Sequence, residues 1–479
     1  MRRSRWGAGA AALVALAAAA CTTEPEARPA DATTRSVASP TESPTESPTD
    51  SPAGSPTESP TDSPGENATG TDDGEPECTE PLVIARHHSR RPLRLSEQRA
   101  RAVADGATGA RLVSSVRAVV RDPSAVAVLP AHLVDPRVRV AVVDGVHPLK
   151  RPRAYPVRVE ADECPPRPTT LTVVGDVMLG RGVASAAAGD HGRQLRPTAA
   201  RLRAADVTVG NLESTLSRAG APRQGGDSFA ADPAVGPALA DAGFDVLSLA
   251  NNHAGDFGPL ALRQTVTRLE AAGLTPFGAG RNLAAARRPA IVEVRGTRFG
   301  FVGFNAIGET PEAGPRTTGA VSVSMPPRTG PLDARELDRF LGDVRRLDDR
   351  VDVVVALPHW GTQYTNRPEP VQRRVARELV AAGVDLVVGG HPHWVQGVST
   401  VGEALVAQSL GNFVFDMDFM TETMLGVVLE TTWWGNRLLA AELAPYRMDA
   451  SFTPRFVRWG AGLPTLRLLG ATSGPAFRY

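Results

Sequence analysis

The chain has 479 residues, which is enough for more than one domain with its own core, and its formal net charge is +0. Because 52 Lys plus Arg are balanced by 52 Asp plus Glu, the chain is not a general polycation, and we predict no nucleic-acid partner.

The N-terminus has the pattern of an export signal. Arginines at positions 2, 3 and 5 precede an apolar run from 8 to 20, which is short for a membrane span. Small residues then precede Cys21, as in a bacterial lipobox, in which Cys21 would be acylated. The alternative is an ordinary signal peptide cleaved within the alanine run. Either interpretation predicts export; the first makes 1–21 a lipoprotein signal and anchors the protein by lipid to the extracytoplasmic face of the cell membrane.

Residues 22–77 form a segment of low complexity. Ser-Pro-Thr-Glu and close variants repeat from 39 to about 64, and the segment has few apolar residues to bury. Prolines and like charges favour an extended, solvated chain, so this segment is predicted to be a disordered stalk.

Apolar patterning resumes near residue 81 and predicts a small α/β accessory module over 78–165. Strands are expected at 82–85 and 138–143, and a helix at 96–104. Cys78 and Cys164 bracket this region and could form a disulfide in an oxidising compartment. The alternative is two free cysteines at a seam between domains. No motif in the module indicates a chemical role.

From residue 169 onwards, one pattern repeats: helix, glycine, short β-branched strand, polar loop. This pattern predicts α/β architecture. Strand-like segments lead into polar loops at 175–181, 210–214, 251–258, 358–361, 389–393 and 411–416. Further strands at 425–430 and 438–443 are predicted to complete a sheet. Because α/β sheets carry functional groups beyond the carboxyl ends of their strands, we expect the polar loops to converge.

The polar loops contain the side chains expected of a metal site: Asp176, Glu213, Asn252, His253, His359, His391 and His393. Carboxylate, amide oxygen and imidazole together suit divalent Mn, Fe or Zn. Pro392 and the preceding glycines supply a bend, so that His391 and His393 could serve two ions about 3.5–4 Å apart. A single loop histidine is more often a surface residue, but recurrence at equivalent positions favours metal.

The same loops, in order, resemble the motifs of the CapA family. They are Gly175-Asp-Val-Met-Leu-Gly-Arg181, Asn211-Leu-Glu213, Ala250-Asn-Asn-His253, His359-Trp-Gly361, Gly390-His-Pro-His393 and Ser409-Leu-Gly-Asn-Phe-Val-Phe-Asp416. CapA proteins are bacterial surface proteins linked to synthesis of poly-γ-glutamate capsules, and the family is similar in fold to calcineurin-like metallophosphoesterases. The resemblance covers about 168–420. It implies a β-sandwich flanked by helices, within a domain that we place at 166–479.

The resemblance also implies roles for individual residues. The metal ligands would be Asp176, Asn252, His359, His391 and His393, with Asn211 or Glu213 in place of a bridging aspartate. His253 would be a general acid or an oxyanion partner. Arg181 could hold an anionic substrate group or form a surface ion pair. Trp360 and Tyr364 are candidates for the substrate-binding wall, although a core position is the simpler interpretation for at least one of Trp360 and Trp394.

Two positions depart from the related patterns. Met178 stands where phosphoesterases have the histidine of Asp-x-His. Gln363 stands where CapA sequences usually have glutamate, and glutamine cannot ionise.

We therefore expect a lipid-anchored, metal-dependent hydrolase of the CapA type, with an anionic envelope polymer or other capsule-synthesis components as partners. One alternative is a non-catalytic component that binds the polymer or assembles its export machinery. The other is an extracytoplasmic metallophosphoesterase, against which the missing histidine at Met178 counts.

Overall fold

The computed structural model describes residues 78–479. The predicted signal peptide, its Cys21 and the predicted stalk lie outside the described residues. Within 78–479, none of the helices combines the length and apolar character needed to cross a membrane.

Residues 78–165 build a small sheet with two helices against it. The central strand β1 pairs on one side with β4 and on the other with β5 and β7, and β3 extends the sheet beyond β4. The helix predicted at 96–104 is present, and the Ser96 side chain caps it by accepting a hydrogen bond from the Arg99 amide. The elements are β1 (Thr79–Arg86), α1 (Glu97–Ala104), β3 (Leu112–Val113), α2 (Val116–Arg121), β4 (Val126–Pro130), β5 (Arg139–Val140) and β7 (Arg158–Glu160).

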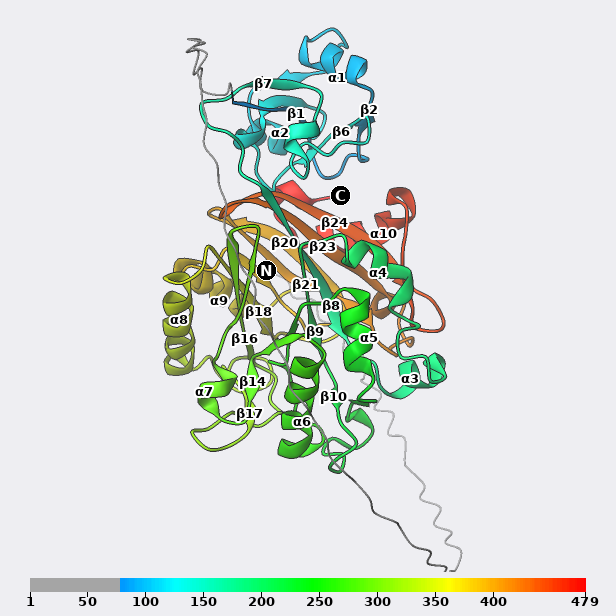
Figure 1. Ribbon diagram of the computed structural model, residues 1–479, viewed down its shortest axis with the longest axis vertical. Helices are drawn as coiled ribbons and strands as arrows, with labels where there is room; N and C mark the ends of the chain where they lie inside the picture. The colour runs from blue at the N-terminus through cyan, green and yellow to red at the C-terminus, as the bar shows by residue number, and fades with distance from the viewer. Residues whose placement is uncertain (1–77) are drawn as a thin grey trace, which may run out of the picture. The chain divides into compact units, whose positions relative to one another are not determined.

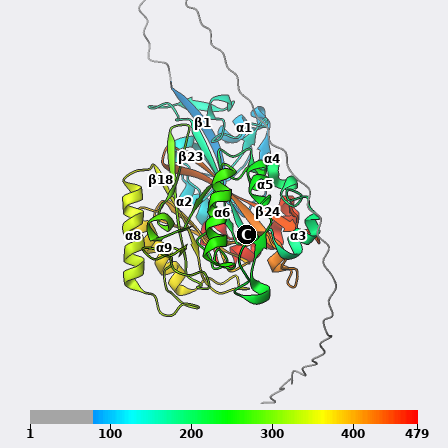
Figure 2. The ribbon, with the colours of Figure 1, turned by 60° about the horizontal axis from the view of Figure 1, so that its bottom comes forward.

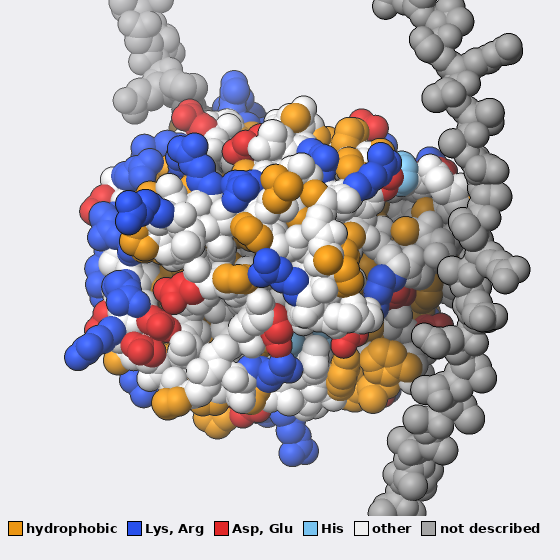
Figure 3. All heavy atoms as spheres, turned by 90° about the horizontal axis from the view of Figure 1, so that it is seen from below, with side chains coloured by type: hydrophobic (Ala, Val, Ile, Leu, Met, Phe, Trp, Pro, Cys, Tyr) orange, Lys and Arg blue, Asp and Glu red, His pale blue; other side chains and the backbone are white. Residues whose placement is uncertain are grey.

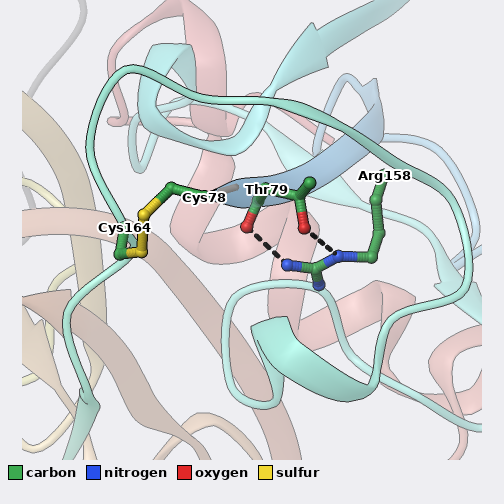
Figure 4. Close-up of a disulfide and its surroundings, with 4 residues drawn as sticks. All are labelled: Cys78, Thr79, Arg158 and Cys164. Atoms are coloured by element: carbon green, nitrogen blue, oxygen red, sulfur yellow. Dashed lines mark hydrogen bonds between the residues drawn. A yellow bond between two sulfur atoms is a disulfide. The ribbon is translucent and has the colours of Figure 1, made fainter. Parts of the chain in front are cut away.

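A disulfide between Cys78 and Cys164 closes this region, with the two Cα atoms 4.9 Å apart (Figure 4). Beside it, the guanidinium of Arg158 donates to the hydroxyl and carbonyl oxygens of Thr79. The first and last strands of the region are therefore joined by covalent and polar contacts as well as by the ladder between β1 and β7.

The remainder of the chain is dominated by two large sheets. The eight-stranded sheet has the order β13-β12-β9-β8-β23-β24-β25, with β22 also paired to β8, and the six-stranded sheet has the order β15-β16-β18-β19-β21-β20. The first contains β8 (Pro168–Val177), β9 (Val207–Leu212), β12 (Val246–Ser248), β13 (Thr275–Phe277), β22 (Asn412–Val414), β23 (Leu425–Trp434), β24 (Arg437–Met448) and β25 (Pro454–Phe456). The second contains β15 (Ala290–Val294), β16 (Thr297–Asn305), β18 (Val353–His359), β19 (Leu386–Val388), β20 (Val395–Val401) and β21 (Ala404–Leu410).

The two sheets pack face to face. Successive residues of a strand point to opposite faces, so each sheet has one face towards the other sheet and one face outwards. In β18, Val353 and Val355 join the core between the sheets, whereas Val354 and Ala356 face the helices outside. In β8, Val173 faces the inter-sheet core and Val174 faces outwards. Both strands are thus buried on both sides, which explains the nearly continuous apolar sequence of β18.

Helices cover the outer face of each sheet (Figures 1 and 2). The eight-stranded sheet is covered by α4 (Arg196–Leu202), α5 (Val235–Ala242) and α6 (Gly258–Ala271), and the six-stranded sheet by α8 (Ala334–Asp348) and α9 (Pro370–Ala381). Gly243 and Gly383 follow α5 and α9 with φ of 100° and 110°, the left-handed conformation that ends a helix and favours glycine. The predicted α/β sandwich flanked by helices is confirmed, and β23 and β24 supply the two predicted terminal strands.

The accessory region packs against β24. Val83 and Leu129 share a buried cluster with Leu439. At the same contact, His147 Nε2 lies 2.9 Å from Glu442 Oε1, and Trp434 Nε1 donates to the carbonyl of Leu149 at 3.0 Å.

Candidate metal centre

Parallel strands bring the predicted ligands to one edge of the sandwich. Strand β8 runs parallel to β9, and β9 to β12; in the second sheet, β16, β18, β19 and β21 are parallel. Their carboxyl ends therefore meet at the same edge, where the strand-to-loop junctions carry the polar groups. The residues that converge there are Asp176, Asn211, Glu213, Asn252, His253, His359, His391 and His393, all of them buried.

Gly390 allows the two sheets to approach at this edge. A Cβ atom on Gly390 would lie 2.6 Å from Asp176 Oδ1, closer than Cβ contacts allow, and 3.1 Å from His359 Nδ1, which is a tight contact. The backbone then turns sharply, because His391 and His393 adopt φ of 93° and 58°, which is uncommon for residues other than glycine. Backbone strain of this kind is concentrated at functional sites. The bend inferred from the Gly-Gly-His-Pro-His sequence is therefore present.

Asp176, Glu213 and His359 form the centre of the cluster. One ligand atom from each lies within 4.8 Å of the others, a separation that one divalent ion could bridge. Around them, His359 Nε2 lies 3.7 Å from Glu213 Oε1 and 2.9 Å from Asn252 Oδ1, and His393 Nδ1 lies 3.7 Å from Asp176 Oδ2. The amide oxygen of Asn252 therefore faces the imidazole of His359, as an oxygen ligand to a shared ion would.

Three buried polar atoms at this centre have no hydrogen-bond partner among the described residues: Glu213 Oε2, His391 Nδ1 and His393 Nε2. A buried polar atom without a partner destabilises a fold by roughly 1–3 kcal/mol. All three can donate a lone pair to a cation, and they come from two separate loops. The residues present therefore fit a divalent metal.

Burial and mutual charge govern the ionisation of the cluster. Burial raises the pKa of Asp176 to about 6, and burial together with the charge of Asp176 raises the pKa of Glu213 well above its usual value. Burial and the neighbouring histidines hold the pKa of His359 and His391 well below the ordinary range, and burial lowers that of His393 to about 3. The imidazoles are thus neutral and available as ligands, and a bound dication would favour ionised carboxylates.

Asn211 is oriented differently from the other predicted ligands. Its amide nitrogen lies 2.9 Å from Asp176 Oδ1 and 3.0 Å from Glu213 Oε1, and donates to both carboxylates. Its amide oxygen accepts a hydrogen bond from Asn251 Nδ2 at 2.9 Å and so points away from the cluster. In this geometry Asn211 positions the two carboxylates. Of Asn211 and Glu213, only Glu213 has a side-chain oxygen without a hydrogen-bond partner among the described residues.

His253 lies at the edge of the cluster with a defined orientation. Its Nδ1 lies 2.9 Å from Asp256 Oδ2, its Nε2 lies 3.0 Å from Asn252 Nδ2, and the Phe229 ring stacks on it with centroids 3.8 Å apart. The Asp256 carboxylate accepts a hydrogen bond, so it favours the tautomer of His253 with its proton on Nδ1. The Nε2 atom then points towards Asn252 and Glu213. A proton carried by His253 would therefore be held at Nε2.

Sequence reasoning did not assign roles to three residues that orient the cluster: Asn251, Asp256 and Asn412. Each lies within or beside a motif that was recognised, and each contacts a predicted functional residue. The only signal available was this adjacency, because the contacts themselves depend on the fold.

The three predicted substrate-binding residues differ in their contacts and exposure. Arg181 forms two hydrogen bonds to Asp416, so the ion-pair alternative describes its position. Trp360 is completely buried and its Nε1 donates to the carbonyl of Gln408, which makes it a core residue behind the site. Tyr364 is partly exposed and stacks on His393, with centroids 6.0 Å apart, so it alone of the three forms a wall beside the cluster.

Met178, at the departure from the Asp-x-His pattern, supplies no ligand. Its side chain is buried in the hydrophobic cluster on the outer face of the eight-stranded sheet, and its sulfur accepts a hydrogen bond from the Gly180 amide at 3.1 Å.

A sandwich of two sheets with buried carboxylates, amides and imidazoles at its strand ends defines an α/β protein built around a candidate divalent-metal centre. The family model described as "Bacterial capsule synthesis protein PGA_cap" matches residues 170–417. This match covers 248 of the 479 residues, and the chain belongs to that family. The resemblance to CapA proteins is thereby confirmed.

Curated relatives agree with this assignment. The chain is 32% identical over 257 residues to "Capsule biosynthesis protein CapA" of Bacillus anthracis, and 29% identical over 254 residues to "PGA biosynthesis protein CapA" of Bacillus subtilis (strain 168). Each alignment covers 52% of this chain, and they cover 60% and 63% of the respective relatives. The chain thus matches less than two thirds of the length of these relatives.

Solved structures give more distant similarities. A hypothetical protein from Thermus thermophilus is 18% identical with a TM-score of 0.38, and covers 58% of this chain and 99% of its own. A structure described as a novel phosphatase, from Mycoplasma pneumoniae, is 10% identical with a TM-score of 0.37, and covers 60% of this chain and 96% of its own.

Proposed function

We propose that this protein acts at the cell envelope in the synthesis of an anionic capsule polymer, and that its buried centre binds divalent metal and hydrolyses a bond of that polymer or its precursor. The observation that carries the proposal is the set of three buried lone-pair donors, on Glu213, His391 and His393, that have no hydrogen-bond partner within residues 78–479. Family membership and the names of the Bacillus relatives support the capsule context. Export and lipid attachment at Cys21 belong to the proposal on sequence grounds alone.

In this function, the metal would be held by Asp176, Glu213, Asn252, His359, His391 and His393. When bound, one or two ions would polarise the scissile group and lower the pKa of a coordinated water. Asn211 would keep the two carboxylates in position, since its amide nitrogen donates to both. Gly390 would leave room for the ligands, because any side chain there would fill the space beside Asp176.

His253 would handle the proton of the leaving group. It lies at the edge of the cluster beside Asn252, and Asp256 at its Nδ1 would stabilise an imidazolium form. The Phe229 ring against its face restricts rotation. Tyr364 would line the neighbouring wall, next to His393.

The test compares the full-length protein with a His391→Ala/His393→Ala variant after supplying Mn or Zn. Near-stoichiometric metal in the wild type and its loss from the variant would support the centre. His191→Ala is the matched control, because His191 is a partly exposed histidine on another part of the chain, 3.9 Å from Asp232. This control should keep its metal.

Metal-loaded protein is then tested on a γ-linked glutamate polymer and on a phosphoester. Cleavage of the polymer supports the proposed function, whereas cleavage of the phosphoester alone supports a phosphoesterase. Bound metal with polymer binding and no cleavage would indicate the non-catalytic component. Absence of metal from folded wild-type protein would reject the hydrolase.

A further inference from the structure

We propose that Arg328 binds an anionic group of the substrate, specifically a carboxylate, at the entrance to the metal centre, and that the Glu309 carboxylate occupies this guanidinium when substrate is absent. The inference rests on the proposed function and names a determinant of its specificity. Neither residue was singled out by the sequence.

The arginine expected to bind an anion, Arg181, already donates from all three of its guanidinium nitrogens. Its Nε donates to Asp416 Oδ2 at 3.1 Å, a second nitrogen donates to Asp416 Oδ1, and a third donates to the carbonyl of Gly226 at 3.3 Å. Its guanidinium also lies over the Phe229 ring, 4.3 Å from the centroid. Binding a substrate through Arg181 would break several of these contacts, so its role is to hold Asp416 and Phe229 in place.

Arg328 differs because its guanidinium has a single polar partner among the described residues. This partner is Glu309, whose Oε1 accepts from Arg328 Nη2. The Arg328 side chain is 48% exposed, and that of Glu309 is 22% exposed. Most of the donors in this planar fork are therefore free to bind an incoming carboxylate, which arginine recognises through two parallel hydrogen bonds.

The pair lies beside the metal-centre residues. Thr310, next to Glu309, accepts a hydrogen bond from the Gly255 amide at 2.8 Å, which holds this loop against the Asn-Asn-His loop. Burial raises the pKa of Glu309, while the charges of Arg328 and His253 and the Asn252 side chain act in the opposite direction. Glu309 thus precedes a residue that is hydrogen-bonded to the loop carrying Asn252 and His253, and Arg328 is bonded to Glu309.

The backbone at Glu309 is strained. Glu309 has φ of 55°, uncommon for a glutamate, and follows Gly308, whose carbonyl accepts from Asn305 Nδ2 at 2.7 Å. The hydroxyl of Thr329 donates to the Ala306 carbonyl at 3.1 Å, so the segment that carries Arg328 is bonded to the segment that carries Glu309. The ion pair is therefore built into two loops that are fixed to each other.

These contacts indicate the chemical class of the ligand. Glu309 already presents a carboxylate to Arg328, one residue before the hydrogen bond between Thr310 and Gly255, so a substrate carboxylate could replace it at the same donors. On the face seen from below, basic side chains are interspersed with acidic ones (Figure 3), and the chain has no net charge. Selection of an anion by one guanidinium is therefore expected, rather than attraction by a broad positive field.

The experiment measures binding of a γ-linked glutamate oligomer with free carboxylates to the full-length, metal-loaded protein. Arg328→Ala is expected to weaken binding about ten- to a hundredfold, the effect of losing a charge-assisted hydrogen-bonded pair. Glu309→Gln is expected to strengthen binding, because it removes the competing carboxylate. The same oligomer with its carboxylates converted to amides should bind wild type and Arg328→Ala equally.

Arg345→Ala is the matched control, since Arg345 is an exposed arginine in the last turn of α8 and its loss changes the net charge equally. Equal weakening by Arg328→Ala and Arg345→Ala, or no weakening by Arg328→Ala, would overturn the assignment of Arg328. Unchanged affinity in Glu309→Gln would overturn the role of Glu309. If the wild type binds metal and oligomer and Arg328→Ala binds them equally well, this inference alone is wrong. If the wild type binds neither, the proposed function is wrong.

Discussion

The Nδ1 atom of His393 lies 2.8 Å from the amide oxygen of Asn412. The orientation of this amide is fixed independently, because Asn412 Nδ2 donates to the carbonyl of Thr423 at 3.1 Å. An amide oxygen only accepts, so the proton of His393 resides on Nδ1 and the lone pair on Nε2, the atom without a partner among the described residues. Asn412 thus prepares His393 to bind metal through Nε2.

Removal of this amide should weaken metal binding. Asn412→Ala is expected to lower metal affinity about 10- to 100-fold, the usual effect of losing a partner that orients a ligand histidine. Chelator competition measures the change. Asn366→Ala is the control, since Asn366 donates to the Leu468 carbonyl in another part of the chain. Equal affinities in wild type and Asn412→Ala would show that His393 is not a ligand through Nε2.

Metal affinity should depend on pH through the carboxylates. The pKa of Asp176 is raised to about 6 and that of Glu213 is raised well above its usual value, whereas burial lowers the pKa of His393 to about 3. A proton competes with metal for an acid below its pKa, so affinity should fall as pH decreases from about 7 to about 5 while the histidines stay neutral.

Calorimetry in buffers of different ionisation enthalpy measures the protons released on binding. Release of about one proton or more per ion near pH 6 is expected from the raised carboxylate pKa values. No proton release at pH 6, with metal bound, would mean that the carboxylates are already ionised in the metal-free protein.

Met178 should be dispensable for metal binding despite its position in the motif. Met178→Leu conserves volume in a hydrophobic cluster and should lower the free energy of unfolding by less than about 1.5 kcal/mol. Metal content of the purified variant should equal that of wild type. Loss of metal from a variant with unchanged stability would indicate that the thioether, and not only the fold around it, serves the centre.

The Cys78–Cys164 disulfide should contribute strongly to stability because its cysteines are 86 residues apart in sequence. Replacing both by serine should lower the free energy of unfolding by roughly 2–5 kcal/mol, because a long loop in the unfolded chain is no longer closed. Urea denaturation without reductant measures the loss. The double variant should then be insensitive to reductant, and the wild type should become less stable when reductant is added.

Much of the fold and of the candidate centre could be predicted from local pattern. Short runs of β-branched and other apolar residues indicated strands such as β18, and glycines such as Gly243 and Gly383 marked helix ends, because both signals depend on neighbours in sequence. The convergence of the ligand residues followed from a general property of parallel strands. Asp176 and His391 are 215 residues apart, yet the backbone amide of His391 donates to Asp176 Oδ2 at 3.0 Å.

The orientation of individual side chains could not be predicted from the sequence. Whether Asn211 offers its oxygen or its nitrogen depends on Asn251, and whether Arg181 is free depends on Asp416, 235 residues away. Hydrogen bonds of this kind are set by the packing of distant segments. The α/β pattern, the family and the chemical types at the strand ends could be predicted from local sequence and motif order. The buried lone-pair donors without a partner in 78–479 could be identified only in the folded chain, because satisfying a buried polar group depends on every segment that surrounds it.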